Sequence, residues 1–187
     1  SNYHDEEVLA VMKEGHSPIH HFAFTALFTA LVTIATSAFK LPVPATNGFI
    51  NLGDTFIFAA ALLWGPKSGF WAGSVGSSLA DVLGGYPHWA PFTFFIKGVE
   101  GLVAGSVAHH RFKDSGATGP ALLGMLLGGL VMAIGYFIAE IFLYGLPAAL
   151  VELPGNGFQA IGSLIIALPL AMALKRLGLD RHKFGPN

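Results

Sequence analysis

The chain has 187 residues, of which 53% are hydrophobic and 11% are charged, and its mean hydropathy is +0.61. Soluble domains carry about 25% charged residues, so this composition indicates an integral membrane protein with one domain. A net charge of −1, without a basic aromatic stripe, argues against a nucleic-acid partner. The absence of cysteine excludes disulfides, thiol catalysis and iron–sulfur ligation.

The two ends of the chain differ from its apolar centre. Residues 1–18 are polar and acidic, whereas a signal peptide would begin with basic and then apolar residues. The start at Ser1-Asn2, without an initiator methionine, is typical of the remnant of a cleaved purification tag. Residues 178–187 form a basic tail, which we expect in the cytoplasm. Residues 19–177 are the predicted transmembrane domain.

The first half of this domain predicts three membrane spans. Residues 19–39 supply the roughly 20 apolar residues that a span requires, and the prolines and Asn-Gly of residues 41–53 predict a loop. A short second span is predicted at about 49–64 and a third at about 68–83. Small residues and one acid recur every fourth position in the third span, at Gly69, Gly73, Ser77 and Asp81. This spacing allows helix backbones to approach closely in lipid.

The second half of the domain alternates apolar spans and polar connections in the same way. The predicted spans are residues 92–108, 119–144 and 158–174. The predicted connections are residues 84–91, 109–114 and 145–157. The last connection is predicted from its prolines and glycines. We therefore predict an all-α integral membrane protein, a bundle of six transmembrane helices.

The distribution of basic residues predicts the orientation of this bundle. With six spans, both termini lie on the side of the connections after the second and fourth spans. That side carries Lys13, Lys67, Arg111, Lys113, Lys175, Arg176, Arg181 and Lys183. The other side carries only Lys40. Because cytoplasmic loops are enriched in Lys and Arg, we expect both termini in the cytoplasm of a prokaryotic cell with the protein in its plasma membrane.

Several charged residues lie inside or at the edge of the predicted spans. They are Asp54, Asp81, Lys97, Glu100 and Glu140. At ~1.5 Å per helical residue, all of them lie in the outer part of the membrane. A charge at membrane depth is costly and usually faces a bundle interior or a cavity, so it indicates a functional site. We predict a pocket that opens to the outside and is closed below.

Each of these charges also has a purely structural interpretation. Lys97 and Glu140 are predicted at similar depths and could pair with each other, or each could hold a substrate group. Lys97 and Glu100, at i and i+3, could pair along one helix. Asp54 and the nearby Asn51 could cap the second helix.

Asp81 and the aromatic residues near the outer side complete the candidate site. Asp81 could cap the turn that follows it. Tyr86, His88 and Trp89 could belong to an interfacial aromatic belt or form a stacking lid over a flat ring. In the fifth span, two tyrosines flank the acid on one face, at i, i+4 and i+8. These three residues are Tyr136, Glu140 and Tyr144.

Catalytic and metal-binding motifs are not evident. The paired histidines at the predicted cytoplasmic ends lack the spacing of metal ligands, and no nucleophile elbow, HExxH or Walker motif occurs. We predict neither an enzyme, nor a metal site, nor a cofactor.

Two stretches resemble a known family. FINLGDTFIFAAALLWGPKSGFWAGSVGSSLADVLGGYP and APFTFFIKGVEGLVAG resemble the substrate-binding S components of energy-coupling factor (ECF) vitamin transporters, in the branch that includes riboflavin, hydroxymethylpyrimidine, pyridoxine and cobalamin S components. The resemblance covers about residues 20–177. It implies a six-helix bundle with a vitamin pocket near the outer face and a gating loop at residues 41–53.

The resemblance also implies partners. They are a transmembrane coupling subunit, which docks on small residues of the first helix, and the two ATPase subunits that drive it. Ala26 and Ala30 match the family's AxxxA pattern, and Ala23 lies beside them. We expect the other contacts of the protein to be membrane lipid and its vitamin.

The leading hypothesis is therefore a high-affinity binding subunit of an ATP-driven vitamin importer. A stand-alone secondary transporter is the alternative, and it would show paired broken helices at the midplane. The candidate pocket has aromatic residues and more carboxylates than lysines. This combination favours a ligand that is a small planar heterocycle with amino and hydroxyl groups. Hydroxymethylpyrimidine, pyridoxine and thiamine are therefore the favoured candidate substrates, and riboflavin and cobalamin remain alternatives.

Overall fold

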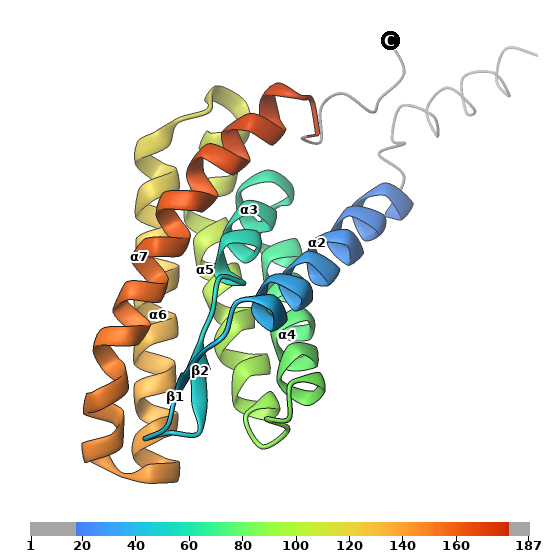
Figure 1. Cartoon of the computed structure of the whole chain (residues 1–187). Coiled ribbons are helices and arrows are strands. Elements are labelled where there is room, and N and C mark those ends of the chain that lie inside the picture. The colour runs from blue at the N-terminus through green and yellow to red at the C-terminus, as the bar shows by residue number, and fades with distance from the viewer. Residues whose placement is uncertain (1–17, 180–187) are drawn as a thin grey trace, which may run out of the picture.

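A computed structural model of the chain describes residues 18–179. Within this range six helices and one two-stranded hairpin follow one another (Figure 1). The helices are α2 (Pro18–Ala38), α3 (Asp54–Trp64), α4 (Pro66–Leu83), α5 (Ala90–Ser115), α6 (Thr118–Tyr144) and α7 (Leu146–Arg176). The strands are β1 (Leu41–Val43) and β2 (Gly48–Ile50). The predicted basic tail and most of the predicted polar N-terminal segment lie outside the described residues.

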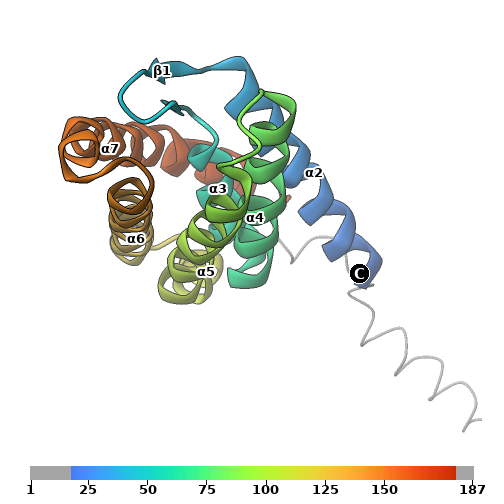
Figure 2. The ribbon, with the colours of Figure 1, turned by 90° about the horizontal axis from the view of Figure 1, so that it is seen from below.

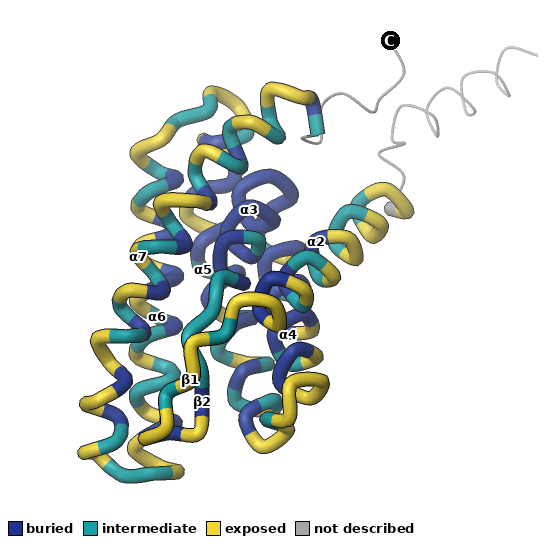
Figure 3. The backbone as a smooth tube through the Cα atoms, viewed as in Figure 1, coloured by how far each residue is buried: buried dark blue, intermediate teal, exposed yellow. Residues whose placement is uncertain are grey.

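The expected all-α bundle is confirmed for the described residues, with three helices long and apolar enough to cross a membrane. These are α2, α6 and α7. The prediction for the second span is wrong, because α3 has only 11 residues and is about 16 Å long at ~1.5 Å per residue. Nearly all of α3 is buried, and α2, α4, α5 and α7 pack around it (Figures 2 and 3). It is a short, buried helix at the centre of the bundle.

The hairpin replaces part of what the sequence predicted as loop and span. Leu41 pairs with Ile50 and Val43 with Gly48, so β1 and β2 run antiparallel. The hairpin lies beside α7, at the same end of the bundle as the α4–α5 and α6–α7 connections (Figure 1). From β2 the chain turns inward to Asp54, which places the first residue of α3 deep within the bundle.

Helices α5 and α7 also extend further than predicted. Residues 109–114 continue α5 instead of forming a turn, and residues 146–157 are the first turns of α7 instead of a loop. Pro147 lies in the first turn of α7, where a missing N–H is harmless. Pro154 lies inside the helix, where neighbouring groups can compensate in a membrane protein.

The small residues of α4 allow the predicted close approach to α5. A β-carbon at Gly69 would lie 2.6 Å from the carbonyl oxygen of Gly101, and one at Gly101 would meet the carbonyl group of Gly69. A β-carbon at Gly73 would likewise meet the backbone carbonyl of Lys97. The two backbones therefore touch, which brings Lys97 against α4 and α3.

We expect Gly101→Ala to destabilise the protein, because the added methyl group must push α5 away from α4. Overpacking of this kind costs about 1–3 kcal/mol. The thermal midpoint of the protein in detergent measures the loss. Gly162→Ala in the middle of α7 is the matched control, since nothing lies within 4 Å of its β-carbon position. Equal midpoints for the two variants would contradict the close backbone contact.

Candidate functional site

A polar cavity opens between the hairpin and helices α4, α5, α6 and α7. Its empty volume is about 430 Å³, including space open to the surroundings. Its lining residues are Thr36, Gly48, Phe49, Asn51, Ser77, Asp81, Trp89, Thr93, Lys97, Tyr136, Glu152, Asn156 and Gln159. Of the residues that the sequence predicted for the site, the cavity collects Asn51, Asp81, Trp89, Lys97 and Tyr136.

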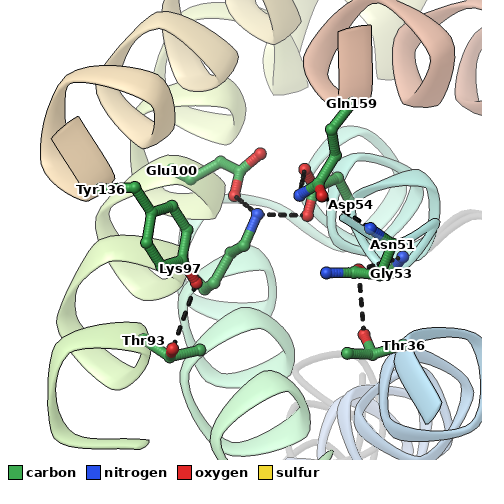
Figure 4. Close-up of polar contacts among 9 residues, drawn as sticks. All are labelled: Thr36, Asn51, Gly53, Asp54, Thr93, Lys97, Glu100, Tyr136 and Gln159. Atoms are coloured by element: carbon green, nitrogen blue, oxygen red, sulfur yellow. Dashed lines mark hydrogen bonds and ion pairs between the residues drawn. The ribbon is translucent and has the colours of Figure 1, made fainter. Parts of the chain in front are cut away.

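A buried ion cluster forms the floor of this cavity. The Lys97 ammonium donates to Oδ1 of Asp54 and, at 3.0 Å, to Oε2 of Glu100 (Figure 4). The three side chains are at most 1% exposed. Because an unpaired charge at this depth is costly, Lys97 holds α3 to α5 by pairing with a carboxylate from each helix.

Amides extend this cluster to the other helices. Nε2 of Gln159 on α7 donates to Oδ2 of Asp54 at 2.8 Å, and its Oε1 accepts the backbone N–H of Asn51 at 2.7 Å. Oδ1 of Asn51 accepts the N–H of Gly53 at 2.8 Å and the hydroxyl of Thr36 at 3.3 Å. A continuous chain of polar contacts thus links α2, the β2–α3 turn, α3, α5 and α7 (Figure 4).

Two structural interpretations of these residues are wrong. Asp54 is the first residue of α3, and its carboxylate bonds to Lys97 and Gln159 instead of capping the helix. Asn51 makes the local turn contact, with the backbone of Gly53. Lys97 does not pair with Glu140, because Asp54 and Glu100 occupy its ammonium.

Two buried carboxylates, one in the cavity lining and one behind it, have oxygens without hydrogen-bond partners among the described residues. Asp81 is 4% exposed, and its Oδ2 has no hydrogen-bond partner among the described residues. The turn after it is closed by its backbone carbonyl, which accepts the N–H of Tyr86 at 2.8 Å. Glu140 accepts one bond from Asn156 at 3.2 Å, and its Oε2 likewise lacks a partner in residues 18–179. The free oxygen of Asp81, which lines the cavity, is suited to accept a hydrogen bond from a ligand, whereas Glu140 is not among the lining residues.

The aromatic residues form one wall of the cavity. Trp89 is 4% exposed, so it does not belong to an interfacial belt, and its ring lies 5.8 Å from that of Tyr136 and 6.0 Å from that of Tyr144. Tyr144 shares a 3.0 Å hydrogen bond with the ring of His88. The ring of Tyr86 packs against that of Phe49 in the hairpin, with centroids 4.9 Å apart and the planes inclined at 59°. The indole N–H of Trp89 has no partner within the described part of the chain, so it can donate to a ligand.

Helix α7 contributes site residues that the sequence analysis missed. Glu152, Asn156 and Gln159 line the cavity, and Glu152 accepts a hydrogen bond from Thr46 at the tip of the hairpin. Residues 145–157 were predicted to be a loop because of their prolines and glycines. The three polar residues nevertheless have the spacing i, i+4 and i+7, which predicts one helix face. Ser163 continues that face, and all four side chains are buried.

The small residues expected to dock a partner lie elsewhere. Ala23, Ala26 and Ala30 are exposed on α2, so they do not pack inside the bundle. Large apolar side chains on the same helix, such as Phe22 and Leu27, are exposed beside them. This surface is available to lipid or to a partner helix.

A helical membrane bundle with a buried polar cavity and an adjacent hairpin defines a membrane-embedded binding protein. Residues 17–176 match the family described as "ECF-type riboflavin transporter, S component". The chain therefore belongs to the family of ECF S components, the membrane subunits that bind vitamins for import, as the sequence analysis predicted. The family consists of transporter components rather than enzymes.

Individual relatives agree with this assignment. The chain is 30% identical over 162 residues to the "thiamine precursor transporter HmpT" of Lactococcus lactis subsp. cremoris, covering 86% of this chain and 91% of that protein. It is 43% identical over 145 residues to an "uncharacterized protein in gap 3'region" of Pyrococcus woesei, covering 78% and 95%. A solved bacterial ECF S component superposes with a TM-score of 0.66 at 20% identity, covering 84% of this chain and 96% of that one, which supports the fold.

We expect Lys97→Met to destabilise the protein severely, because it leaves two buried carboxylates without a counter-ion. Breaking a buried pair from one side costs about 3–5 kcal/mol. The thermal midpoint and the yield of folded protein measure the effect. Lys67→Met, at an exposed position, is the matched control.

A variant that neutralises the whole cluster distinguishes the effect of the unpaired charges on stability from the effect of altered packing. Lys97→Met combined with Asp54→Asn and Glu100→Gln removes every charge of the cluster, so it should recover much of the lost stability. A Lys97→Met protein as stable as Lys67→Met would show that the ion cluster does not hold the bundle together.

Proposed function

We propose that this S component binds an amino-substituted single-ring vitamin precursor of the hydroxymethylpyrimidine type. The observation that carries this proposal is the excess of acceptors around the cavity. Asp81 and Glu152 line it, and Lys97 is the one cation among its lining residues. The ammonium of Lys97 is already paired with Asp54 and Glu100, and a further carboxylate, Glu140, accepts from the lining residue Asn156. A ligand that presents amino and hydroxyl hydrogens complements such a site.

The aromatic residues of the cavity support the same class of ligand. Trp89 and Tyr136 line it with their rings 5.8 Å apart and inclined at 65°, so a flat ring can lie against the indole, with Asp81 placed to accept a hydrogen bond from an exocyclic amine. The relative named as a thiamine precursor transporter points to the same chemistry.

The proposed topology follows from charge and structure together. Among the described residues, the basic side chains at the end of the bundle away from the hairpin are Lys67, Arg111, Lys113, Lys175 and Arg176. The hairpin end carries Lys40. We place the hairpin end outside the plasma membrane of a prokaryotic cell, with both termini in the cytoplasm. The cavity then faces the external medium.

In this proposal the protein captures its ligand outside and works with a transmembrane coupling subunit and two ATPases. Ala23, Ala26 and Ala30 form the docking patch, since small exposed residues let a partner helix approach closely in lipid. Uptake should therefore require the coupling ATPases. Concentrative uptake without them, driven by an ion gradient, would favour a stand-alone secondary transporter.

A panel of ligands tests the substrate. Hydroxymethylpyrimidine, thiamine, pyridoxine and riboflavin are titrated into purified protein, and tryptophan fluorescence reports binding through Trp89. We expect hydroxymethylpyrimidine to bind tightest. Asp81→Asn should weaken it at least tenfold, about 1.4 kcal/mol, without loss of folding, because Oδ2 of Asp81 has no internal partner.

Asp114→Asn, which changes an exposed carboxylate at the opposite end, is the control and should bind normally. Tighter binding of riboflavin than of the pyrimidine would refute the proposed substrate class. Unchanged affinity in Asp81→Asn would show that Asp81 does not contact the ligand. The substrate class would then be decided by the relative affinities of the ligands in the panel.

The docking patch is tested by Ala26→Trp combined with Ala30→Trp. Two indoles on this face should block assembly with the coupling subunit and abolish uptake, while ligand affinity stays intact because neither residue lines the cavity. Leu126→Trp with Leu130→Trp is the control, since these exposed α6 residues have the same spacing. Pull-down and ligand titration are run on both proteins. Assembly of the α2 variant at the level of the control would show that the patch does not dock.

A further inference from the structure

The ammonium of Lys40 is held between the hairpin and the α4–α5 turn. Lys40 belongs to the link from α2 to β1, and its Nζ lies 4.5 Å from the ring centre of Phe49 and 5.5 Å from that of Tyr86. A β-carbon at Gly84 would collide with this nitrogen, so the turn leaves room for it because residue 84 is glycine. Ring faces attract an ammonium through their negative quadrupole. The positive charge of Lys40 therefore has a defined position.

This position adjoins the polar cavity. Phe49 and Asp81 are both lining residues of that cavity. The backbone carbonyl of Asp81 accepts the N–H of Tyr86, so one turn carries both the carboxylate and a ring that holds Lys40. The charge of Lys40 acts on the Asp81 carboxylate, whose Oδ2 has no hydrogen-bond partner among the described residues. Lys40 thus lies near the acceptor that we assign to the ligand.

Lys40 differs from Lys97, the cation in the cavity lining. The ammonium of Lys97 is paired with Asp54 and Glu100, so two carboxylates offset its charge. The Lys40 ammonium makes no hydrogen bond or ion pair with any residue between 18 and 179. Because no carboxylate in that range pairs with it directly, its positive field extends toward a ligand in the cavity.

The lining residues by themselves would favour a cationic ligand. Asp81 and Glu152 are the carboxylates of the lining, and its one lysine is already paired. A cation would gain attraction from both carboxylates. Lys40 adds a repulsion at the edge of the same space, which acts on a cation and not on a neutral molecule. Specificity is a difference between two affinities, so such a repulsive element can set it.

We propose that Lys40 is a specificity-determining residue, which shifts the preference of the cavity from cations toward neutral ligands. A neutral aminopyrimidine donates its amino hydrogens to Asp81 without meeting the repulsion. A ligand of the same shape that carries an ammonium group loses to Lys40 part of what it gains from Asp81. The inference deepens the proposed function and rests on it for the amino-substituted ring, whereas the position of Lys40 beside the cavity does not depend on the ligand.

A matched pair of ligands tests the charge preference. Hydroxymethylpyrimidine and its aminomethyl analogue share one ring, and the analogue carries a positive charge at pH 7. Both are titrated into the purified full chain, and the ratio of their dissociation constants cancels any general effect of a variant on folding. We expect Lys40→Gln to improve the relative affinity of the cation about fivefold, which corresponds to ~1 kcal/mol of repulsion. Lys40→Arg should keep the ratio, and the exposed Lys67→Gln at the opposite end is the matched control.

A second measurement needs no ligand, because the chain has no cysteine. Ser77→Cys places one thiol in the cavity lining. Its rates of modification by a cationic and an anionic methanethiosulfonate of similar size are compared. We expect the rate ratio of cation to anion to rise about fivefold when Lys40→Gln is added, since the repulsion of the cation is then removed. Adding Lys67→Gln should leave the ratio unchanged.

The outcomes separate this inference from the proposed function. Equal ratios in the Lys40→Gln and Lys67→Gln proteins would overturn the role of Lys40. Weaker binding of both pyrimidines by the same factor would also overturn it, because Lys40 would then only support the hairpin. A chain that binds neither pyrimidine, but whose thiol rates respond to Lys40→Gln, would refute the proposed substrate class and retain the charge preference.

Discussion

The buried lysine of α5 is the constraint on which the rest of the structure depends. One ammonium within an apolar bundle must be paired, and a single carboxylate would hold only one neighbouring helix. Lys97 instead takes Glu100 from its own helix and Asp54 from α3, which fixes the short helix at the centre of the bundle. Because α3 begins at Asp54, the chain before it must run inward, and the hairpin is the part of that chain that remains near the surface.

Glycine makes this arrangement possible. Lys97 reaches α3 because α4 and α5 touch along Gly69 and Gly101, where a side chain would separate the backbones. The excess of small residues in this part of the chain is therefore part of the site, although none of them bonds to a ligand. The same contact explains why α4, which is rich in Gly and Ser, is less apolar than a typical span. Much of its surface faces protein.

The sequence predicted the helical bundle and the charged centre, because charges in apolar segments and small-residue spacing are local features. It did not predict partners for Asp54, since pairing depends on depth, and Asp54 was placed near the outer start of a span, whereas α3 begins deep in the bundle. It also misassigned the start of α7, where prolines and glycines outweighed a clear helical spacing of polar residues. Glu152, Asn156 and Gln159 were missed for that reason alone. The structure shows that Ala26 and Ala30 are exposed on α2, and their docking role stays a prediction.

Gln159 shows how one residue can couple the parts of this protein. Its amide bonds to Asp54 on one side and to the backbone of Asn51 on the other, so it joins α7 to both the ion cluster and the chain that leaves the hairpin. A movement of the hairpin away from α7 must therefore break the hydrogen bond between Asn51 and Gln159 or shift Gln159 with it. It must also break the hydrogen bond between Thr46 and Glu152. Widening the cavity by such a movement would therefore disturb the surroundings of the Lys97 cluster. Ligand binding and the stability of the bundle are linked through the same few hydrogen bonds.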